Sequence, residues 1–332
     1  MTASRYDVVA IGNAIVDIIG RCDDEFLKRH DAPKGHMRLV DAATVDKLYS
    51  EMGPAIEISG GSAANTMVGL SSFGGRAAFI GKVADDEFGR IFRHDVTASG
   101  VAFPTAPVAG RAPTSRSLIL VTPDGERTMN TYLGISTELD NGEVDPATIE
   151  AAEIVYLEGY LFDQPQAKAA FREAAAIARR AGRRVALTLS DSFCVDRHRD
   201  EFLDLMRSSI DILFANETEI TALYQTADFD AAARQAAADA PLAVLTRSAR
   251  GSVIFQGTHS VTIAAEPVDE VIDTTGAGDL YAAGFLFGFA RSGDLTTAGR
   301  LASLAASEII SHIGARPETN LGQLAKSRGI LD

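Results

Sequence analysis

Short β-rich segments alternate with alanine-rich helical segments over most of this chain, and this alternation constrains its fold more than any other feature. Helical patterns such as 166–181 and 228–239 place apolar residues three and four positions apart. Strands joined through helices of this length predict a parallel sheet that is covered by helices on both faces. The predicted strands are 7–11, 77–83, 154–157, 184–189, 211–215 and 242–245.

Two excursions, at about 16–40 and about 112–134, interrupt this alternation. Each contains two short segments in which apolar and polar residues alternate, as they do in the strands of a small sheet. We interpret the two excursions as a β-sheet flap outside the main domain, and extra edge strands of the main sheet are the alternative. The four strands predicted in them are 16–21, 37–40, 115–121 and 127–133.

The pattern changes again after the last of the main strands. Residues 252–264 predict a hairpin, and helical patterns follow at about 278–291 and about 297–312. No internal repeat or low-complexity linker is visible in the sequence. We therefore expect residues 1–332 to form one α/β domain with a small β-sheet lid.

The composition of the chain argues against some classes of binding partner. The formal net charge is −14, which argues against nucleic acid as the main partner because phosphate backbones require basic surfaces. No apolar run reaches the roughly 18 residues of a membrane span. The N-terminus lacks the pattern of a secretory signal, and Cys22 and Cys194 lack the spacing of a disulfide framework. These features predict a cytoplasmic protein without a membrane or nucleic-acid partner.

The run DTTGAGD at 273–279 is the clearest candidate for a chemical site. Gly276 and Gly278 allow backbone amides to converge, and a helical pattern begins there, so that the positive end of a helix faces the same point. This arrangement suits phosphoryl oxygens. Asp279 would repel a phosphate, but it makes chemical sense as the acceptor of a proton from an attacking hydroxyl group. An ordinary helix cap after a glycine turn is the alternative.

Four motifs, in order along the chain, resemble those of the ribokinase/PfkB family of carbohydrate and nucleoside kinases. DTTGAGD resembles the C-terminal signature of that family, GGSAAN at 60–65 resembles its N-terminal signature, and NETE at 216–219 is similar to its N-x-x-E motif. GNAIVD at 12–17 resembles the adenosine kinase branch, as do the segments 125–133 and 186–206. The resemblance covers nearly the whole chain.

The resemblance implies a doubly wound, mainly parallel sheet flanked by helices, with a small β-sheet lid over the ligand cleft. It also implies transfer of the γ-phosphoryl group of ATP, with Mg²⁺, to the 5′-hydroxyl group of adenosine, which gives AMP and ADP. Asp279 is then the base, and the amides of Gly276, Ala277 and Gly278 stabilise charge on the transferred group. Glu219 is expected to hold Mg²⁺ through water. The residues expected to contact ATP are Arg127, Asn216, Thr246, Gly251 and Gly278.

The resemblance further implies a nucleoside pocket under the lid. Asp17 and Asn65 match positions that bind ribose hydroxyl groups, which need fixed donors and acceptors when they are buried. Met129 and Leu133 match positions that wall the purine. The expected substrate-binding residues are Asn13, Asp17, Gly61, Ser62, Asn65, Met129, Thr131, Leu133 and Tyr160.

Several of these roles have structural alternatives. Without the resemblance, Asp17 is better interpreted as a strand-end or turn aspartate, and the alternative for Arg127 is a solvated charge on a hairpin. Tyr160 or Phe162 is expected to supply an aromatic face for the base, with core packing as the alternative for either residue.

Asp273 and Thr275 match positions that, by the same resemblance, bind a monovalent cation such as K⁺, together with carbonyl groups near 312–314. The alternative is that Asp273 only caps the turn.

Other functions stay open at this point. The closest rival is a sugar kinase of the same family, acting on fructose, ribose or a keto-deoxy sugar, and an inosine or guanosine kinase is another. A nucleotide-binding sensor without catalysis is the rival from a different class. A dinucleotide-dependent enzyme is disfavoured because Gly12 does not lead into a G-x-G-x-x-G turn. The sequence leaves open whether the protein is a monomer or a homodimer.

Overall fold

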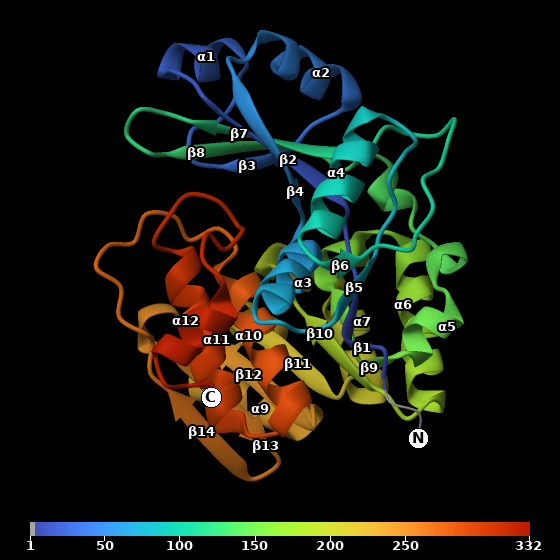
Figure 1. The fold of residues 1–332 in the computed structure, drawn as a ribbon, viewed down its shortest axis with the longest axis vertical. Coiled ribbons are helices and arrows are strands. Elements are labelled where there is room, and N and C mark those ends of the chain that lie inside the picture. The colour runs from blue at the N-terminus through green and yellow to red at the C-terminus, as the bar shows by residue number, and fades with distance from the viewer. Residues whose placement is uncertain (1–3) are drawn as a thin grey trace.

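The large sheet of this computed structural model, which describes residues 4–332, has nine strands in the order β14-β13-β12-β11-β10-β9-β1-β5-β6 (Figure 1). The strands from β12 to β6 run parallel, whereas β13 pairs antiparallel with both β12 and β14. The strands are β1 (Tyr6–Ile11), β5 (Ala77–Ile80), β6 (Val101–Ala102), β9 (Ala152–Glu158), β10 (Arg184–Thr188), β11 (Ile212–Asn216), β12 (Leu242–Thr246), β13 (Ser252–Gln256) and β14 (His259–Ile263).

The central strand β1 shows why apolar runs form this sheet. Val8 and Ala10 pack into the core on one face and Val9 and Ile11 into the core on the other, and all four are fully buried. A parallel strand that is covered on both faces needs consecutive apolar residues and not alternation. Each of the six predicted main strands is present, and the expected doubly wound, mainly parallel sheet is confirmed.

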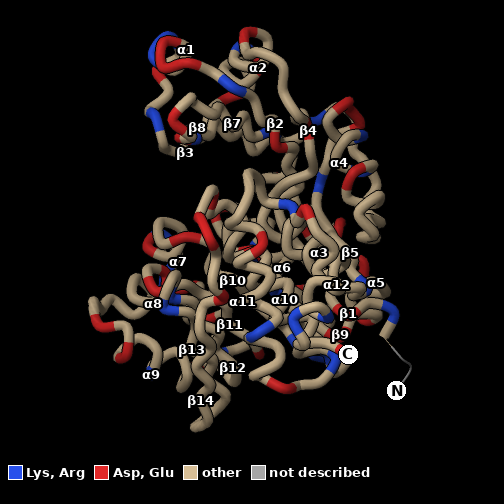
Figure 2. The backbone as a smooth tube through the Cα atoms, turned by 60° about the vertical axis from the view of Figure 1, so that its left-hand side comes forward, with Lys and Arg blue, Asp and Glu red and all other residues tan. Residues whose placement is uncertain are grey.

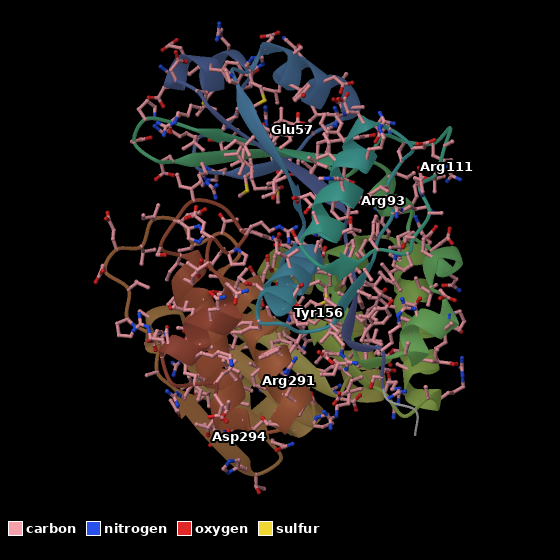
Figure 3. The ribbon with its side chains drawn as sticks, in the orientation of Figure 1. Glu57, Arg93, Arg111, Tyr156, Arg291 and Asp294 are labelled. Atoms are coloured by element: carbon pink, nitrogen blue, oxygen red, sulfur yellow. The ribbon has the colours of Figure 1, made fainter. Side chains whose placement is uncertain are left out.

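Two layers of helices cover the two faces of the large sheet. The first layer consists of α3 (Ser62–Ser72), α4 (Glu87–Ala98), α10 (Ala277–Ser292), α11 (Leu295–Ile309) and α12 (Leu321–Ser327). Tyr156 of β9, labelled in Figure 3, is buried under this layer. The second layer consists of α5 (Pro146–Glu150), α6 (Pro165–Arg180), α7 (Ser192–Ser209), α8 (Glu217–Leu223) and α9 (Phe229–Asp239). Short 3₁₀ turns span Gly134–Glu138, Asn141–Glu143, Gly159–Asp163 and Ser248–Arg250.

A second, five-stranded sheet lies at one end of the large sheet (Figure 1). Its order is β3-β8-β7-β2-β4, and α1 (Asp24–Arg29) and α2 (Ala42–Glu51) cover its outer face. The two sequence excursions therefore form a separate sheet and not edge strands of the large one. The strands are β2 (Ile15–Arg21), β3 (Met37–Leu39), β4 (Ala55–Gly60), β7 (Ser115–Val121) and β8 (Arg127–Tyr132).

Strand β4 was missing from the sequence-based prediction. Its sequence, AIEISG, runs directly into the glycine pair Gly60-Gly61, which masks the end of the strand. Because β4 leads into α3, the small sheet is connected directly to a helix of the large domain.

Acidic and basic residues are interspersed along the backbone around both sheets, as Figure 2 shows. Within residues 4–332, no helix combines the length and the apolar character that crossing a membrane requires.

Candidate active site

Asp279 lies in the first turn of α10, beside the start of α3. Gly276, just before α10, has a left-handed φ of 80°, and a Cβ there would lie 2.9 Å from the Cβ of Ala315. The Asp279 carboxylate accepts hydrogen bonds from Ser62 Oγ at 2.6 Å and from Asn65 Nδ2 at 3.0 Å. The structure thus brings together three predicted residues from distant parts of the sequence.

The start of α3 depends on Gly61. This residue has a φ of 91°, and a Cβ on it would lie 2.2 Å from the backbone oxygen of Asn13. A Cβ on Gly278, by contrast, would meet no atom of residues 4–332 within 4 Å. The N-terminal ends of α3 and α10 therefore converge beside open space, where their positive partial charges favour an anion.

Burial raises the pKa of the Asp279 carboxyl group, while the hydrogen bonds from Ser62 and Asn65 and the charge of Arg316 act in the opposite direction. A carboxylate with a raised pKa is a stronger base, which suits proton transfer from a hydroxyl group near neutral pH.

Glu158, at the end of β9, was not identified from the sequence. Its carboxylate accepts hydrogen bonds from Asn13 Nδ2 at 2.7 Å and from the backbone amide of Ala63 at 2.8 Å. Burial raises the pKa of Glu158 to about 7. The amide group of Asn13 is thus already held by Glu158, so Asn13 has its side-chain oxygen left for a ligand. The position of Glu158 at the carboxyl end of a predicted strand was the only signal for it.

Residues on the inner face of the small sheet, opposite α1 and α2, form two rows. Strand pairing places Asp17 beside Ser117 and Ser117 beside Thr131, and the hydroxyl oxygens of Ser117 and Thr131 are 2.8 Å apart. The second row is apolar and crosses four strands. Its members are Ile19, Ile119, Met129 and Met37.

Sequence reasoning found only part of these two rows. It identified Asp17, Thr131 and Met129, but the neighbours contributed by β3 and β7 became visible only through the register of the strands. Leu133, the other predicted lid residue, lies just beyond the end of β8 and begins a 3₁₀ turn.

Asp17 lies against Gly60, the last residue of β4. A Cβ on Gly60 would lie 2.2 Å from a carboxylate oxygen of Asp17, so this approach requires glycine. Burial raises the pKa of Asp17 to about 7, and Arg316 and Arg127 lower it in part, whereas Asp279 raises it further. Asp17 is therefore more than a strand-end residue, because it shares one electrostatic environment with the proposed base.

Arg316 is the second residue that sequence reasoning missed. Its guanidinium donates to the backbone oxygen of Ser59 from Nε at 2.9 Å and from Nη2 at 2.6 Å, and to the backbone oxygen of Ala64 from Nη1 at 2.9 Å. Burial lowers the pKa of Arg316 to about 10, and the charges of Asp95, Asp17 and Asp279 act against that change. Arg316 therefore connects the C-terminal segment to the junction between β4 and α3.

Arg127, at the start of β8, reaches the turn that precedes α10. Its Nη1 donates to Asp273 Oδ2 and, at 2.8 Å, to Thr275 Oγ1. The side chain is 12% exposed, which excludes a solvated hairpin charge. The hairpin formed by β7 and β8 lies above this turn in Figure 1. The small sheet and the turn are therefore connected by a buried ion pair.

The predicted nucleotide residues lie at the ends of β11 and β12. Asn216 and Thr246 are partners in the register of these strands. Asn216 and Glu219 form a capping box: the Asn216 amide donates to Glu219 Oε2 at 3.0 Å, and the Glu219 amide donates to Asn216 Oδ1 at 2.8 Å. Because of this capping box, both residues of the N-x-x-E motif stabilise the start of α8. Gly251 has a φ of 77°, and a Cβ there would lie 2.0 Å from the backbone oxygen of Ile263.

The two candidate aromatic residues differ sharply in burial. Phe162 is 1% exposed and stacks on Phe202 with ring centroids 4.1 Å apart, so it belongs to the core and does not reach a ligand. Tyr160 is 41% exposed. Burial of its hydroxyl end and the nearby charges of Asp191 and Asp279 raise the pKa of Tyr160. Of these two candidates, only Tyr160 is therefore exposed enough to reach a ligand.

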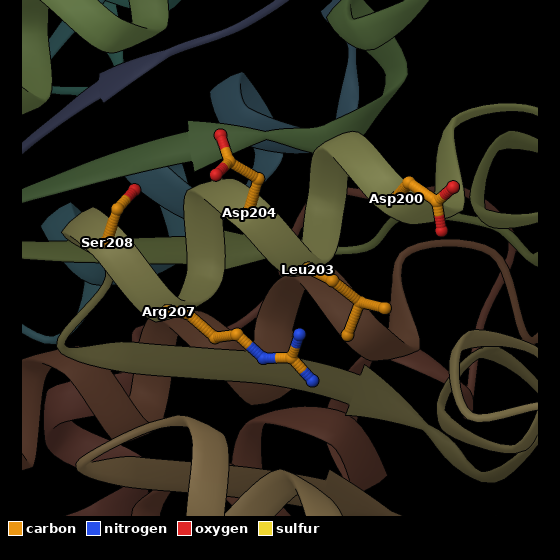
Figure 4. A pocket seen from close by; sticks show the side chains of 5 residues that line it. All are labelled: Asp200, Leu203, Asp204, Arg207 and Ser208. Carbon is orange, nitrogen blue, oxygen red and sulfur yellow. The ribbon is translucent and has the colours of Figure 1, made fainter.

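A separate surface pocket lies on α7, away from these residues (Figure 4). It is lined by Asp200, Leu203, Asp204, Arg207 and Ser208. Within the part of the chain that the structure describes, residues 4–332, no group of three or more His, Cys, Asp and Glu side chains is arranged to hold a metal ion.

Comparisons with known proteins fit this geometry. The family model described as "pfkB family carbohydrate kinase" matches residues 55–320. The crystal structure of adenosine kinase from Sinorhizobium meliloti is 53% identical, with a TM-score of 0.91 over 98% of this chain and 100% of that chain. A probable sugar kinase from Rhizobium etli is 50% identical, with a TM-score of 0.92 over 99% of this chain and 100% of that one. An ATP-dependent ribose-1-phosphate kinase from Halopiger xanaduensis is 30% identical over 85% of this chain and 92% of its own length.

Proposed function

The chain belongs to the pfkB family of carbohydrate kinases, which phosphorylate a hydroxyl group of a small molecule with ATP, and from this premise we propose that its acceptor is the 5′-hydroxyl group of adenosine. The products are then AMP and ADP. The similar solved structures carry two different kinds of name, adenosine kinase and probable sugar kinase, so the choice between nucleoside and sugar depends on the site itself.

The inner face of the small sheet is the observation that supports a nucleoside. A ribose needs hydroxyl acceptors, which the row of Asp17, Ser117 and Thr131 offers. A purine needs a flat apolar surface, which the adjacent row through Ile119 and Met129 offers. A free sugar has no group that would use the second row. The two rows together match a ligand that is polar at one end and apolar at the other.

In the proposed reaction, the small sheet closes as a lid over the nucleoside and excludes water. The Asp279 carboxylate, oriented by Ser62 and Asn65, takes the proton of the 5′-hydroxyl group as this oxygen attacks the γ-phosphorus of ATP. The amides of the turn 276–278 stabilise negative charge on the transferred group.

In this proposal, the nucleotide binds at the carboxyl ends of β11 and β12, near Asn216, Thr246 and Gly251. Burial raises the pKa of Glu219 to about 7, and the negative charges of Asp191 and Asp279 add to this effect. This concentration of negative charge fits a hydrated cation that arrives with ATP. Mg²⁺, when bound with ATP near Glu219, would neutralise charge on the phosphoryl oxygens.

A coupled ADP-release assay tests the proposal. Adenosine is expected to give the highest kcat/KM in a panel that also contains inosine, guanosine, ribose, fructose and ribose 1-phosphate. A preference for any sugar would contradict the role of the apolar row. Absence of ADP release with every compound would favour a nucleotide-binding sensor.

The kcat/KM for adenosine is expected to fall as the pH falls below about 7. The pKa of Asp17 is raised to about 7, so this carboxyl group takes up a proton in this range; burial also raises the pKa of Asp279 above its ordinary value, and its protonation adds to the loss. Protonated Asp17 loses an acceptor for ribose, and protonated Asp279 is not a base. The loss should therefore approach about tenfold per pH unit or more, measured at saturating ATP.

An Asp17→Asn variant provides the comparison for this profile. It should bind adenosine more weakly than the unmodified enzyme above about pH 7, where Asp17 is ionised, and its profile should lack the contribution of Asp17. Asp279, Glu158 and Glu219, whose pKa values are also raised, account for the decline that it retains. A profile of the unmodified enzyme that stays flat into the acid range would show that neither carboxyl group titrates there.

A further inference from the structure

The carboxylate of Asp273 is fully engaged by its neighbours. Its Oδ1 accepts hydrogen bonds from the amide of Thr275 at 3.0 Å and from Thr275 Oγ1 at 2.7 Å. Its Oδ2 accepts from the amide of Gly314 at 2.9 Å and from Nη1 of Arg127. The Asp273 side chain is 5% exposed. The positive charge beside this buried carboxylate is therefore the guanidinium of Arg127, which belongs to the small sheet.

These residues do not fit the monovalent cation that the sequence resemblance implied. A K⁺ site is built from several oxygen atoms that replace the water shell of the ion. Here the hydroxyl oxygen of Thr275 accepts a hydrogen bond from Arg127 at 2.8 Å, and Gly314 turns its amide, not its carbonyl, to Asp273. A cation would have to displace Arg127 to reach the same oxygens. The guanidinium and the ion are thus alternatives at one position.

We propose that Arg127 supplies the positive charge behind the anion-binding turn, in place of a monovalent cation, so that the kinase does not require K⁺. The part of this inference that concerns turnover rests on the proposed function. Because Arg127 is carried by β8, this charge reaches the turn only when the small sheet lies over it. Closure of the small sheet therefore completes the electrostatics of the turn that receives the phosphoryl group.

The remaining donors of Arg127 fit this role. Its Nε and Nη2 are buried and have no hydrogen-bond partner among residues 4–332. A buried charged donor without a partner is unfavourable, and it is available to an anion that enters beside it. A single guanidinium can thus hold Asp273 through Nη1 and meet a phosphoryl oxygen through its other nitrogens.

The test compares three proteins: the unmodified chain, Arg127→Met and the control Arg21→Met, with thermal unfolding measured in the absence of ligand. Arg21 is an exposed arginine on β2 of the same small sheet. Thermal unfolding and the initial rate with adenosine are measured in KCl and in N-methyl-D-glucamine chloride at equal ionic strength. The unmodified chain and Arg21→Met should show the same Tm and the same rate in both salts. Arg127→Met should be less stable and slower, and K⁺ should restore part of both because Asp273 is then free to bind it.

Two results would overturn the proposal. One is a several-fold activation or a clear stabilisation of the unmodified chain by K⁺. The other is an Arg127→Met variant that K⁺ neither stabilises nor activates. If Arg127→Met does not fold, Arg127→Lys replaces it, and dependence of its Tm on K⁺ is the expected result because the shorter ammonium group leaves room at Asp273. No dependence would count against the proposal.

Thermal unfolding needs no substrate. A wrong assignment of adenosine as the acceptor would leave the pattern of Tm values intact, whereas a wrong assignment of Arg127 would abolish that pattern even if adenosine is phosphorylated.

Discussion

The variant Asp279→Asn is expected to lose roughly 10²- to 10⁴-fold in kcat with adenosine, while the affinity for adenosine changes little. Asparagine has nearly the same shape as aspartate, and its side-chain oxygen still accepts a hydrogen bond from Ser62, which donates to Asp279 at 2.6 Å. The amide does not accept a proton from the 5′-hydroxyl group. The loss should therefore appear in turnover and not in binding. Steady-state kinetics together with calorimetric titration of adenosine separate the two effects.

Stability provides the first control for this experiment. In the variant, an amide nitrogen faces Asn65 Nδ2, which donates to Asp279 at 3.0 Å, so a modest loss of stability is expected unless the side chain rotates. Asp230→Asn, an exposed aspartate in the first turn of α9, removes the same charge far from the site and should leave kcat unchanged. Near-normal turnover of Asp279→Asn would show that another group is the base.

The variant Arg316→Met is expected to be less stable by roughly 3–5 kcal/mol, because it removes a buried guanidinium together with its hydrogen bonds to Ser59 and Ala64. The carbonyl oxygens of Ser59 and Ala64 each lose a charged donor, and Asp95 loses an attractive positive charge. Chemical denaturation with urea measures this loss.

The same variant should also change the pH dependence. The charge of Arg316 lowers the pKa of both Asp17 and Asp279, so its removal raises both pKa values. The acid decline of kcat/KM should then begin at a higher pH than in the unmodified enzyme. Arg316→Lys keeps the charge without the fork of donors, and it should lose stability but retain most of the original pH profile. If the pH dependence of kcat/KM in Arg316→Met were unchanged, Arg316 would only stabilise the junction between β4 and α3.

Local patterns were sufficient to predict most of the fold. The apolar runs of the large sheet are consecutive because each strand is buried on two faces, and that requirement is visible in one segment at a time. The small sheet was predicted from alternation, except for β4, whose end merges with a glycine pair. The resemblance to the kinase family, which the family match confirms, came from short motifs whose glycines permit particular backbone conformations.

The candidate site could be predicted only in part. Asp279, Ser62 and Asn65 were identified because they belong to recognisable motifs, and the structure places them in contact. Glu158 and Arg316 were not identified, because neither belongs to such a motif. Phe162 was an open candidate for the base pocket until its stacking on Phe202 placed it in the core.

The sequence by itself determined most of the segments that become strands and helices, the position of the glycine turn before α10 and the family to which the chain belongs. These properties depend on periodicity and on residues that are close together along the chain. Only the tertiary structure decided the partners of the buried charges, such as Arg127 with Asp273 and Arg316 with Ser59 and Ala64. The energy of a charge depends on its burial and on its distance from other charges. Both quantities are set by the packing of segments that lie far apart in the sequence.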